Sequence, residues 1–190
     1  MPPPDIALML PEDILAWPVL LRHFTPADAP RVQELVGDRS VSDTTAVIPY
    51  PYPDGMAEAW IATHARERAC GIQYAYAILR AEDRLLVGAI VLRPVADEHE
   101  NLGYWIGREY WGRGYATAAV RAMVALAFRC LDCRQVTASH LARNVGSGRV
   151  LEKCGLTIVH RESREHRGRI EPFCVCGVTR DAWEAGTGMR

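Results

Sequence analysis

Two glycines flank a cation in the stretch EYWGRGYATAAV, where Gly112, Arg113 and Gly114 come directly before a run typical of a helix. Glycine allows a positive φ and a close approach of the backbone to a ligand. The first turn of a helix leaves N–H donors unpaired beside the positive end of the helix dipole. Together these features predict a seat for an anion, most often a phosphate. A tight strand-to-helix turn with a solvated Arg113 explains the glycines equally well, so other parts of the chain must decide.

Two common phosphate-binding folds do not fit this stretch. The dinucleotide-binding pattern G-x-G-x-x-G lacks its third glycine, because Thr117 stands there. Asp132 has about the right separation for the ribose-binding acid, but it precedes a predicted strand instead of following one. The strands before the glycines also form predicted hairpins rather than a βαβ unit. A P-loop is excluded because the chain contains no G-x-x-x-x-G-K-[ST].

A second informative stretch, ARNVGSGRVLEKCGL, spans residues 142–156. Together with LGYWIGREYWGRGYATAAV it resembles the GNAT superfamily of acetyl-CoA-dependent N-acetyltransferases, in particular the RimJ/RimL-like branch that acetylates ribosomal-protein N-termini. The superfamily signature Q/R-x-x-G-x-G/A is met over residues 111–116, except that Trp111 takes the first place. The branch signature N-x-x-S-x-R-V-L-E-K-x-G-F is met from Asn144 to Gly155, with Leu156 in place of the phenylalanine. The order of elements agrees from about residue 17 to residue 183.

The resemblance implies a binding site for acetyl-CoA as cosubstrate, with no metal. The backbone N–H groups of residues 112–117 are expected to hold the coenzyme A pyrophosphate, and Arg113 adds positive charge. The strand 101–107 is expected to splay from its neighbour and to expose its backbone to the pantetheine arm. Asn144 is expected to bind the pantetheine or to hold the loop that carries Ser147. The expected cofactor-binding residues are Tyr104, Trp105, Ile106, Gly112, Arg113, Gly114, Tyr115, Ala116, Thr117 and Asn144.

Acetyl transfer requires a neutral amine, a stabilised oxyanion and a thiolate that leaves, usually with a proton. By analogy with the branch, Ser147 is the candidate that assists the thiolate, and a role as helix N-cap has equal support. Many relatives carry a glutamate as general base where this chain has Asn101. Glu100 is the predicted base, although a one-residue offset points it to the other face of a strand. A water chain is an alternative, and further candidates are Glu98, His99, Glu162 and Glu165.

Hydrophobic periodicity predicts the elements that must position these residues. The predicted fold class is α/β: a single GNAT-like domain over residues 17–185, with an N-terminal extension (1–16) and a tail (186–190). Its central, mostly antiparallel, twisted sheet has about seven strands, is flanked by about four helices and is splayed at the acetyl-CoA site. A proline-rich loop at 47–55 is either a stiff surface connection or a lining of the acceptor pocket. The predicted strands are 18–24, 72–79, 84–93, 101–107, 134–141, 156–163 and 170–179, and the predicted helices are 26–36, 56–68, 116–131 and 147–154.

Composition narrows the class of protein and its partners. The chain has 190 residues, and 22 Lys and Arg against 23 Asp and Glu leave a formal net charge of −1. This balance disfavours a charge-led attraction to nucleic acid or to anionic lipid. The N-terminus has neither a basic region nor an unbroken apolar run, so we expect no signal peptide or membrane span and a cytoplasmic location. The six cysteines are expected as buried, reduced thiols rather than metal ligands.

Three functions remain open. The first is acetylation of a primary amine, with a protein N-terminal α-amine as the favoured acceptor. The second keeps the reaction and takes a small amine, such as an antibiotic, polyamine or amino-acid derivative. The third is a non-catalytic module that binds an acyl-CoA. The expected partners are therefore acetyl-CoA and an amine acceptor, in a monomer or homodimer.

Overall fold

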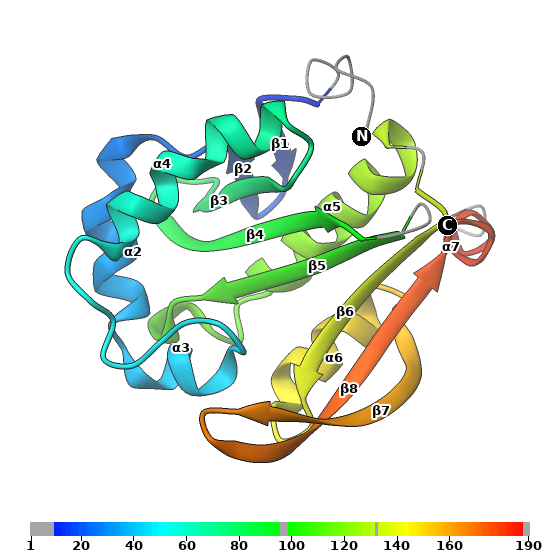
Figure 1. Ribbon diagram of the computed structural model, residues 1–190. Helices are drawn as coiled ribbons and strands as arrows, with labels where there is room; N and C mark the ends of the chain where they lie inside the picture. The colour runs from blue at the N-terminus through cyan, green and yellow to red at the C-terminus, as the bar shows by residue number, and fades with distance from the viewer. Residues whose placement is uncertain (1–9, 96–98, 132, 188–190) are drawn as a thin grey trace.

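The computed structural model describes residues 10–95, 99–131 and 133–187. Its centre is one eight-stranded sheet in the order β1-β2-β3-β4-β5-β6-β8-β7 (Figure 1). Neighbouring strands are antiparallel, except that β5 and β6 run parallel. The strands are β1 (Asp13–Ala16), β2 (Val19–Arg22), β3 (Tyr74–Arg80), β4 (Leu86–Pro94), β5 (His99–Ile106), β6 (Gln135–Leu141), β7 (Thr157–His166) and β8 (Arg169–Thr179).

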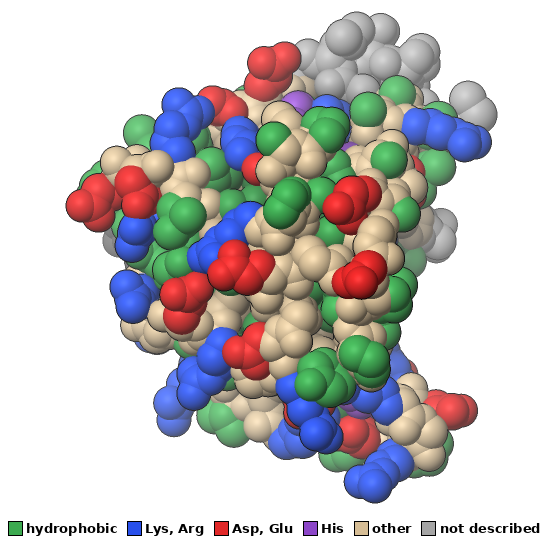
Figure 2. Space-filling model, turned by 90° about the vertical axis from the view of Figure 1, so that its left-hand side faces the viewer, with side chains coloured by type: hydrophobic (Ala, Val, Ile, Leu, Met, Phe, Trp, Pro, Cys, Tyr) green, Lys and Arg blue, Asp and Glu red, His purple; other side chains and the backbone are tan. Residues whose placement is uncertain are grey.

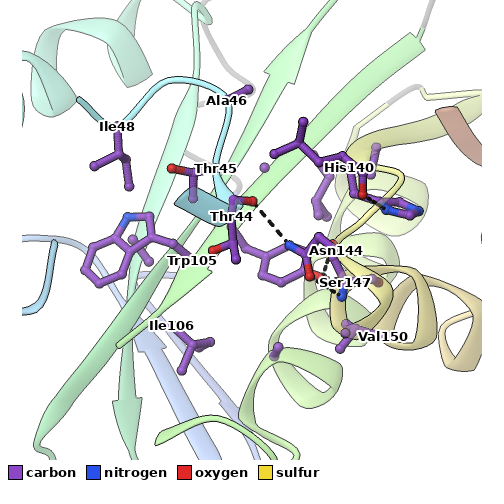
Figure 3. Close-up of a pocket in the computed structure, with 18 of the residues that line it drawn as sticks. Thr44, Thr45, Ala46, Ile48, Trp105, Ile106, His140, Asn144, Ser147 and Val150 are labelled. Carbon is purple, nitrogen blue, oxygen red and sulfur yellow. Dashed lines mark hydrogen bonds between the residues drawn. The ribbon is translucent and has the colours of Figure 1, made fainter. Parts of the chain in front are cut away.

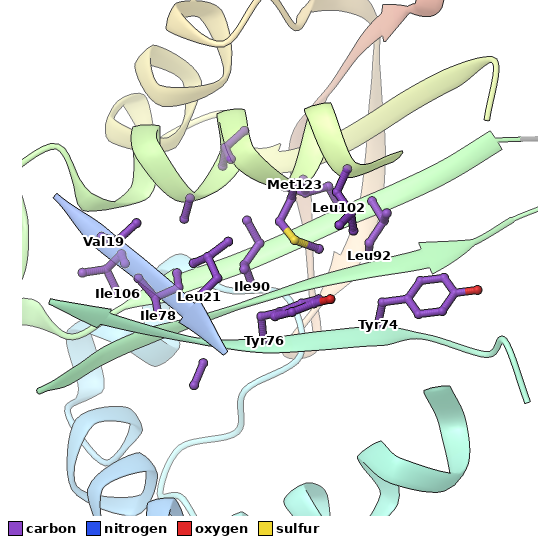
Figure 4. Close-up of a cluster of buried hydrophobic side chains, with 14 of the residues drawn as sticks. Val19, Leu21, Tyr74, Tyr76, Ile78, Ile90, Leu92, Leu102, Ile106 and Met123 are labelled. Carbon is purple, nitrogen blue, oxygen red and sulfur yellow. The ribbon is translucent and has the colours of Figure 1, made fainter. Parts of the chain in front are cut away.

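Helices cover both faces of this sheet. The helix α5 packs on one face, while α2 and α4 lie on the other (Figures 1 and 4). Two helices go beyond the four that were predicted: α3, which precedes the proline-rich loop, and the C-terminal α7. The α-helices are α2 (Ala29–Val36), α3 (Arg39–Thr44), α4 (Met56–Ala69), α5 (Tyr115–Cys130), α6 (Val145–Lys153) and α7 (Arg180–Thr187), and the short 3-10 helices are Pro26–Asp28 and Arg108–Tyr110.

The eighth strand, β1, comes from the segment expected as an N-terminal extension. It pairs with β2 from Asp13 opposite Arg22 to Ala16 opposite Val19. The strand is only four residues long and charged residues adjoin it, so its periodicity is too short to be recognised. The hairpin of β7 and β8 is also longer than predicted, and its turn shrinks to Arg167 and Gly168. Cross-strand pairing extends these strands through polar residues that carry little hydrophobic pattern.

The main core lies between the sheet and α5. Leu21, Ile78, Ile90, Leu102 and Met123 are at most 2% exposed and come from five different elements (Figure 4). Because β3 and β4 are covered on both faces, their central residues form nearly continuous buried runs. The core therefore fixes the positions of β4 and β5, the two strands that also contribute residues to the site described below.

The strands β5 and β6 separate after a short stretch of pairing. They pair only from His99 opposite Gln135 to Asn101 opposite Thr137. Beyond this point β5 stays paired with β4 as far as Ile106, and β6 stays paired with β8 as far as Leu141. The sheet thus opens into a V between β5 and β6 (Figure 1), which confirms the predicted splay.

The hairpin of β7 and β8 holds the segment after α3 against one side of this opening. Arg167 donates to the Ile48 carbonyl at 2.8 Å and forms an ion pair with Asp43 at 2.9 Å. The buried His166 ring lies 3.1 Å from the Thr45 carbonyl and 3.1 Å from the Glu171 carboxylate.

On the face that includes α2 and α4, acidic and basic side chains are interspersed with apolar ones (Figure 2).

Candidate active site

A cavity of about 1100 Å³ occupies the V between β5 and β6. It is lined by both sides of β5, the glycine turn before α5, the start of α6 and the loop after α3. Cavities for one small molecule usually measure about 300–1000 Å³. The opening is therefore at the upper end of the size range for a small-molecule site.

The glycine turn has the geometry of an anion seat. Gly112 and Gly114 have φ values of +76° and +83°, a region that side chains disfavour. The first backbone bond of α5 runs from the Ala118 N–H to the Gly114 carbonyl at 3.0 Å, so the N–H groups of residues 115–117 have no acceptor within the helix. A Cβ added at either glycine would meet no atom within 4 Å. The backbone here is consequently open to a ligand.

Three cations line the cavity near this turn: Arg113, Arg149 and Lys153. Arg113 precedes α5 and also lies over the Tyr110 ring at 5.8 Å, whereas the other two come from α6. Their charges add to the partial positive charge at the start of α5. Arg149 and Lys153 were absent from the predicted binding residues, although both belong to the R-V-L-E-K part of the second signature.

Asn144 is the N-cap of α6 and ties that helix to α3. Its Oδ1 accepts from the Ser147 N–H at 3.1 Å, and its Nδ2 donates to the Thr44 carbonyl at 3.2 Å (Figure 3). Because Asn144 fills the N-cap position, Ser147 is the third residue of the helix, and its hydroxyl is not used as a cap. The N-cap alternative for Ser147 is thus wrong.

The freed hydroxyl of Ser147 faces β5 across the V. Its Oγ lies 2.8 Å from the Tyr104 hydroxyl. Burial raises the pKa of Tyr104 to about 12, and the hydrogen bond with Ser147 acts in the opposite direction. The phenol therefore holds its proton at neutral pH. Two connected hydroxyls thus link β5 to α6 inside the V, and each can donate a proton to a neighbouring anion.

The glycine turn, α6 and the Tyr104–Ser147 pair form one half of the cavity. The other half lies over the face of β5 that carries Trp105. Trp105 lines it from β5, and Thr45, Ile48 and Tyr52 line it from the loop that follows α3 (Figure 3). Of the two interpretations of the proline-rich loop, the structure supports the lining of a pocket. We call this part of the cavity, from β4 and Trp105 to the loop and β7, the acceptor half.

The structure does not bring Glu100 to the cavity. Glu100 lies on the buried face of β5 and is absent from the cavity lining. Burial raises the pKa of its carboxyl to about 7, and its Oε2 has no hydrogen-bond partner among the described residues. Burial, followed by the charge of Glu100, raises the pKa of the Cys133 thiol to about 11. These observations put Glu100 beside Cys133 rather than beside a substrate.

The other candidate bases are not in the cavity lining either. His99, Glu162 and Glu165 do not line it, and Glu98 falls outside the described residues. Glu162 forms an ion pair with Arg164. Among the residues described, the cavity lining includes no Asp or Glu at all. This lack of acid in the lining was not foreseen from the sequence.

Within the described ranges, no three His, Cys, Asp or Glu side chains come together as a metal site. Cys133, Cys174 and Cys176 are buried, Cys130 and Cys154 are partly buried, and Cys70 is exposed. All six are free thiols in the structure. No described helix has both the length and the apolar character needed to cross a membrane.

Comparisons with known proteins agree with this geometry. The family model for the acetyltransferase (GNAT) domain matches residues 19–157. The probable N-acetyltransferase YjcK of Bacillus subtilis is 36% identical over 93 residues, which cover 47% of this chain and 50% of YjcK. The chain thus matches about half the length of this curated relative.

Solved structures share the fold at low sequence identity. RimL, a ribosomal-protein alpha-N-acetyltransferase solved in complex with coenzyme A, superposes with a TM-score of 0.81 at 16% identity, covering 90% of this chain and 99% of RimL. The microcin self-immunity acetyltransferase MccE, solved with acetyl-CoA and AMP, gives 0.79 at 13% identity, with 90% and 98% covered. Since the family model spans most of its length, this chain belongs to the GNAT family of acetyltransferases.

Proposed function

We propose that the protein transfers an acetyl group from acetyl-CoA to a primary amine. The observation that carries this proposal is the arrangement of the cavity, which has an anion seat at residues 112–117, a pair of hydroxyls at Tyr104 and Ser147, and a separate acceptor half. The anion seat can bind the pyrophosphate of coenzyme A, and the pair of hydroxyls can protonate its thiolate. The acceptor half leaves room for the amine on the far side of the thioester.

The edge of β5 that faces β6 supplies the first contacts of the reaction. After Asn101 this edge has no partner strand, so its N–H groups are available to the pantetheine arm and to the thioester oxygen. Such donors stabilise the oxyanion that forms when the amine attacks the carbonyl carbon. In this proposal Trp105 and Ile106 act through their backbone, whereas Tyr104 also contributes its side-chain hydroxyl.

Collapse of the tetrahedral intermediate breaks the C–S bond and produces a thiolate. Ser147 gives a proton to this sulfur, and the Tyr104 hydroxyl, 2.8 Å away, replaces it or donates directly. The proton that the amine loses then restores the phenol through water. The raised pKa of Tyr104 favours the protonated phenol that this step requires. The resemblance implies this role for Ser147 and implies only cofactor binding for Tyr104. The short distance between their hydroxyls supports a role for both in this step.

No acidic side chain of the described lining is placed to take the proton of the amine. An α-amine has a pKa near 8, so roughly a tenth of it is neutral at pH 7, whereas a lysine amine has a pKa near 10.4. We therefore propose that the acceptor enters as the free amine and that water or the imidazole of His140, which lines the cavity, takes the proton after attack. This favours a protein N-terminal α-amine over a lysine side chain.

The acceptor itself is proposed from two kinds of support. The RimL likeness and the signature over 144–155 favour a protein N-terminal α-amine. A small amine is the second candidate, because the acceptor half is enclosed by Trp105, Ile48 and Tyr52. A non-catalytic acyl-CoA module is the third, and the Tyr104–Ser147 pair counts against it.

Turnover of acetyl-CoA with a panel of N-terminal peptides and small amines tests the proposal. We expect free coenzyme A to appear only with an acceptor, and the variant Ser147→Ala to reduce its rate of release. Tight binding of coenzyme A without turnover of any acceptor would contradict the enzymatic proposal and favour the binding module.

A further inference from the structure

A partly buried arginine faces the acceptor half of the cavity. Arg93 lies on β4 opposite Asn101 of β5 and is one of the lining residues. One of its terminal nitrogens, Nη1, lies 3.8 Å from the position that a Cβ on Gly103 would occupy. Because Gly103 carries no side chain, nothing on β5 separates this guanidinium from the middle of the V.

This guanidinium is incompletely paired by the protein. Its Nε donates to the Gln73 Oε1 at 2.9 Å, and no other hydrogen bond is found for it within the described residues. A guanidinium has five N–H donors, so most of them remain available. Glu67 is the carboxylate whose charge acts on Arg93, but it already accepts from Gln73 and from Thr63, the latter at 2.8 Å.

The two other arginines of the acceptor half differ in this respect. Arg143 forms an ion pair with Glu171 at 2.8 Å, and Arg164 forms one with Glu162. Arg93 has no carboxylate within ion-pair distance among the residues that the structure describes, and burial lowers its pKa. Removing a cation from water without a counter-charge is unfavourable, so such a group normally meets an anion when its site is filled.

We propose that Arg93 binds an anionic group of the acceptor, so that the substrates are primary amines that also carry a carboxylate or a phosphate. This inference rests on the proposed acetyl transfer and specifies its acceptor. The guanidinium can bind either anion through two parallel N–H bonds. The described lining contains no acid that would hold a second positive charge, so polyamines and basic peptides are disfavoured.

The anion has two possible sources, which matched acceptors distinguish. The peptide series compares Ala-Glu-Ala-Ala with its Gln and Lys counterparts at the second position. The small-molecule series compares β-alanine with β-alaninamide, and O-phosphoethanolamine with ethanolamine. In the series that contains the natural class, we expect kcat/KM to be roughly 10- to 100-fold higher for the anionic member, the range of a charge-assisted hydrogen bond.

Two variants connect this selectivity to Arg93. Arg93→Gln is expected to reduce kcat/KM for the anionic acceptor to that of the neutral one, without lowering turnover of the neutral one. Arg164→Gln, which alters a paired arginine of the same cavity, is expected to retain the selectivity. A thermal shift with coenzyme A, retained in both variants, shows that each is folded and has its cofactor half intact.

A binding measurement separates this inference from the proposed reaction. Calorimetry with the coenzyme A-loaded protein and the N-acetylated forms of the Glu and Gln peptides, or N-acetyl-β-alanine and its amide, requires no turnover. Tighter binding of the anionic member, lost in Arg93→Gln, supports the anion site even if no acceptor is acetylated. Equal binding and equal turnover of anionic and neutral members in both series would overturn it, as would selectivity that persists in Arg93→Gln.

Discussion

The hydroxyl of Tyr104 on β5 lies 2.8 Å from the Oγ of Ser147 on α6, across the opening between the two halves of the sheet. Forty-three residues separate these side chains along the chain, and they meet only because β5 and β6 diverge. The pair is held from both sides, since Tyr104 belongs to a paired strand and the backbone of Ser147 is capped by Asn144. This contact supports several measurable expectations.

Ser147→Ala is expected to reduce kcat and kcat/KM together by roughly 100-fold, because it removes a proton donor that acts only in the transition state. Stability should fall by only about 1 kcal/mol, from the lost hydrogen bond to Tyr104, since the serine hydroxyl caps no helix. Tyr104→Phe is the companion variant, and a loss smaller than that of Ser147→Ala indicates a relay rather than direct donation.

Ser147→Asp is expected to remain folded and to lose turnover. An acidic residue in the first helical turn is favourable for stability, but its negative charge lies beside the developing thiolate. Steady-state kinetics and a melting curve together check this expectation. Near-normal kcat in this variant would show that the serine is structural.

Asn144 carries two separable contacts. Asn144→Ala removes both and is expected to lower the free energy of unfolding by about 1–2 kcal/mol, as for other N-caps. Asn144→Asp keeps an oxygen for the Ser147 N–H but loses the donor to the Thr44 carbonyl. We expect the aspartate variant to regain most of the stability and to bind the acceptor more weakly, which denaturant unfolding and KM measurements would show. Equal stability of the two variants would contradict the capping role.

Coenzyme A is expected to raise the melting temperature of the protein, and Gly114→Val is expected to abolish that rise. A ligand at a hundredfold excess over its Kd stabilises the native state by about 2.7 kcal/mol. Gly55 offers a matched control, because it is also a helix N-cap in the left-handed region, with φ and ψ of 78° and −5° against 83° and −5° at Gly114. Gly55→Val should therefore show a similar loss of stability and retain the shift. An undiminished shift in Gly114→Val would refute the anion seat.

Glu100 is expected to make stability depend on pH. Burial raises its pKa from 4.5 to about 7, so the folded protein retains a proton that the unfolded chain releases. The stabilisation is fully present below pH 4.5 and is lost as the pH rises through 7, by an amount on the order of 3 kcal/mol. In Glu100→Gln, the fall in unfolding free energy between pH 4.5 and 8 should be smaller.

The same variant tests the predicted role of Glu100 as base. Since this residue lies outside the cavity, Glu100→Gln is expected to leave kcat/KM unchanged at neutral pH. A large loss of kcat/KM with retained coenzyme A binding would instead support the original prediction of a catalytic base.

Local features of the fold were accessible from the sequence. The glycines at 112 and 114 indicate the turn before α5, because positive φ depends on a single residue and its neighbours. Alternation and helical spacing indicate the hairpin of β3 and β4 and the helices α4 and α5, since those patterns are set by which face is buried. The two signatures indicate the family because each lies within one short segment.

Other features depend on contacts between segments far apart in the sequence, and only the tertiary structure shows them. The strand β1 exists because β2 offers it a partner. Glu100 stays out of the cavity because it lies where β5 is still paired with β6, before the sheet opens. Asn144 caps α6 through a local bond to Ser147, but the Thr44 carbonyl that accepts from its side-chain amide lies 100 residues away. Arg93 is a single charge in an apolar strand of the sequence, and only the register of β4 against β5 places it over Gly103. Such contacts join residues distant in sequence, so their geometry is determined by the packing of the whole sheet.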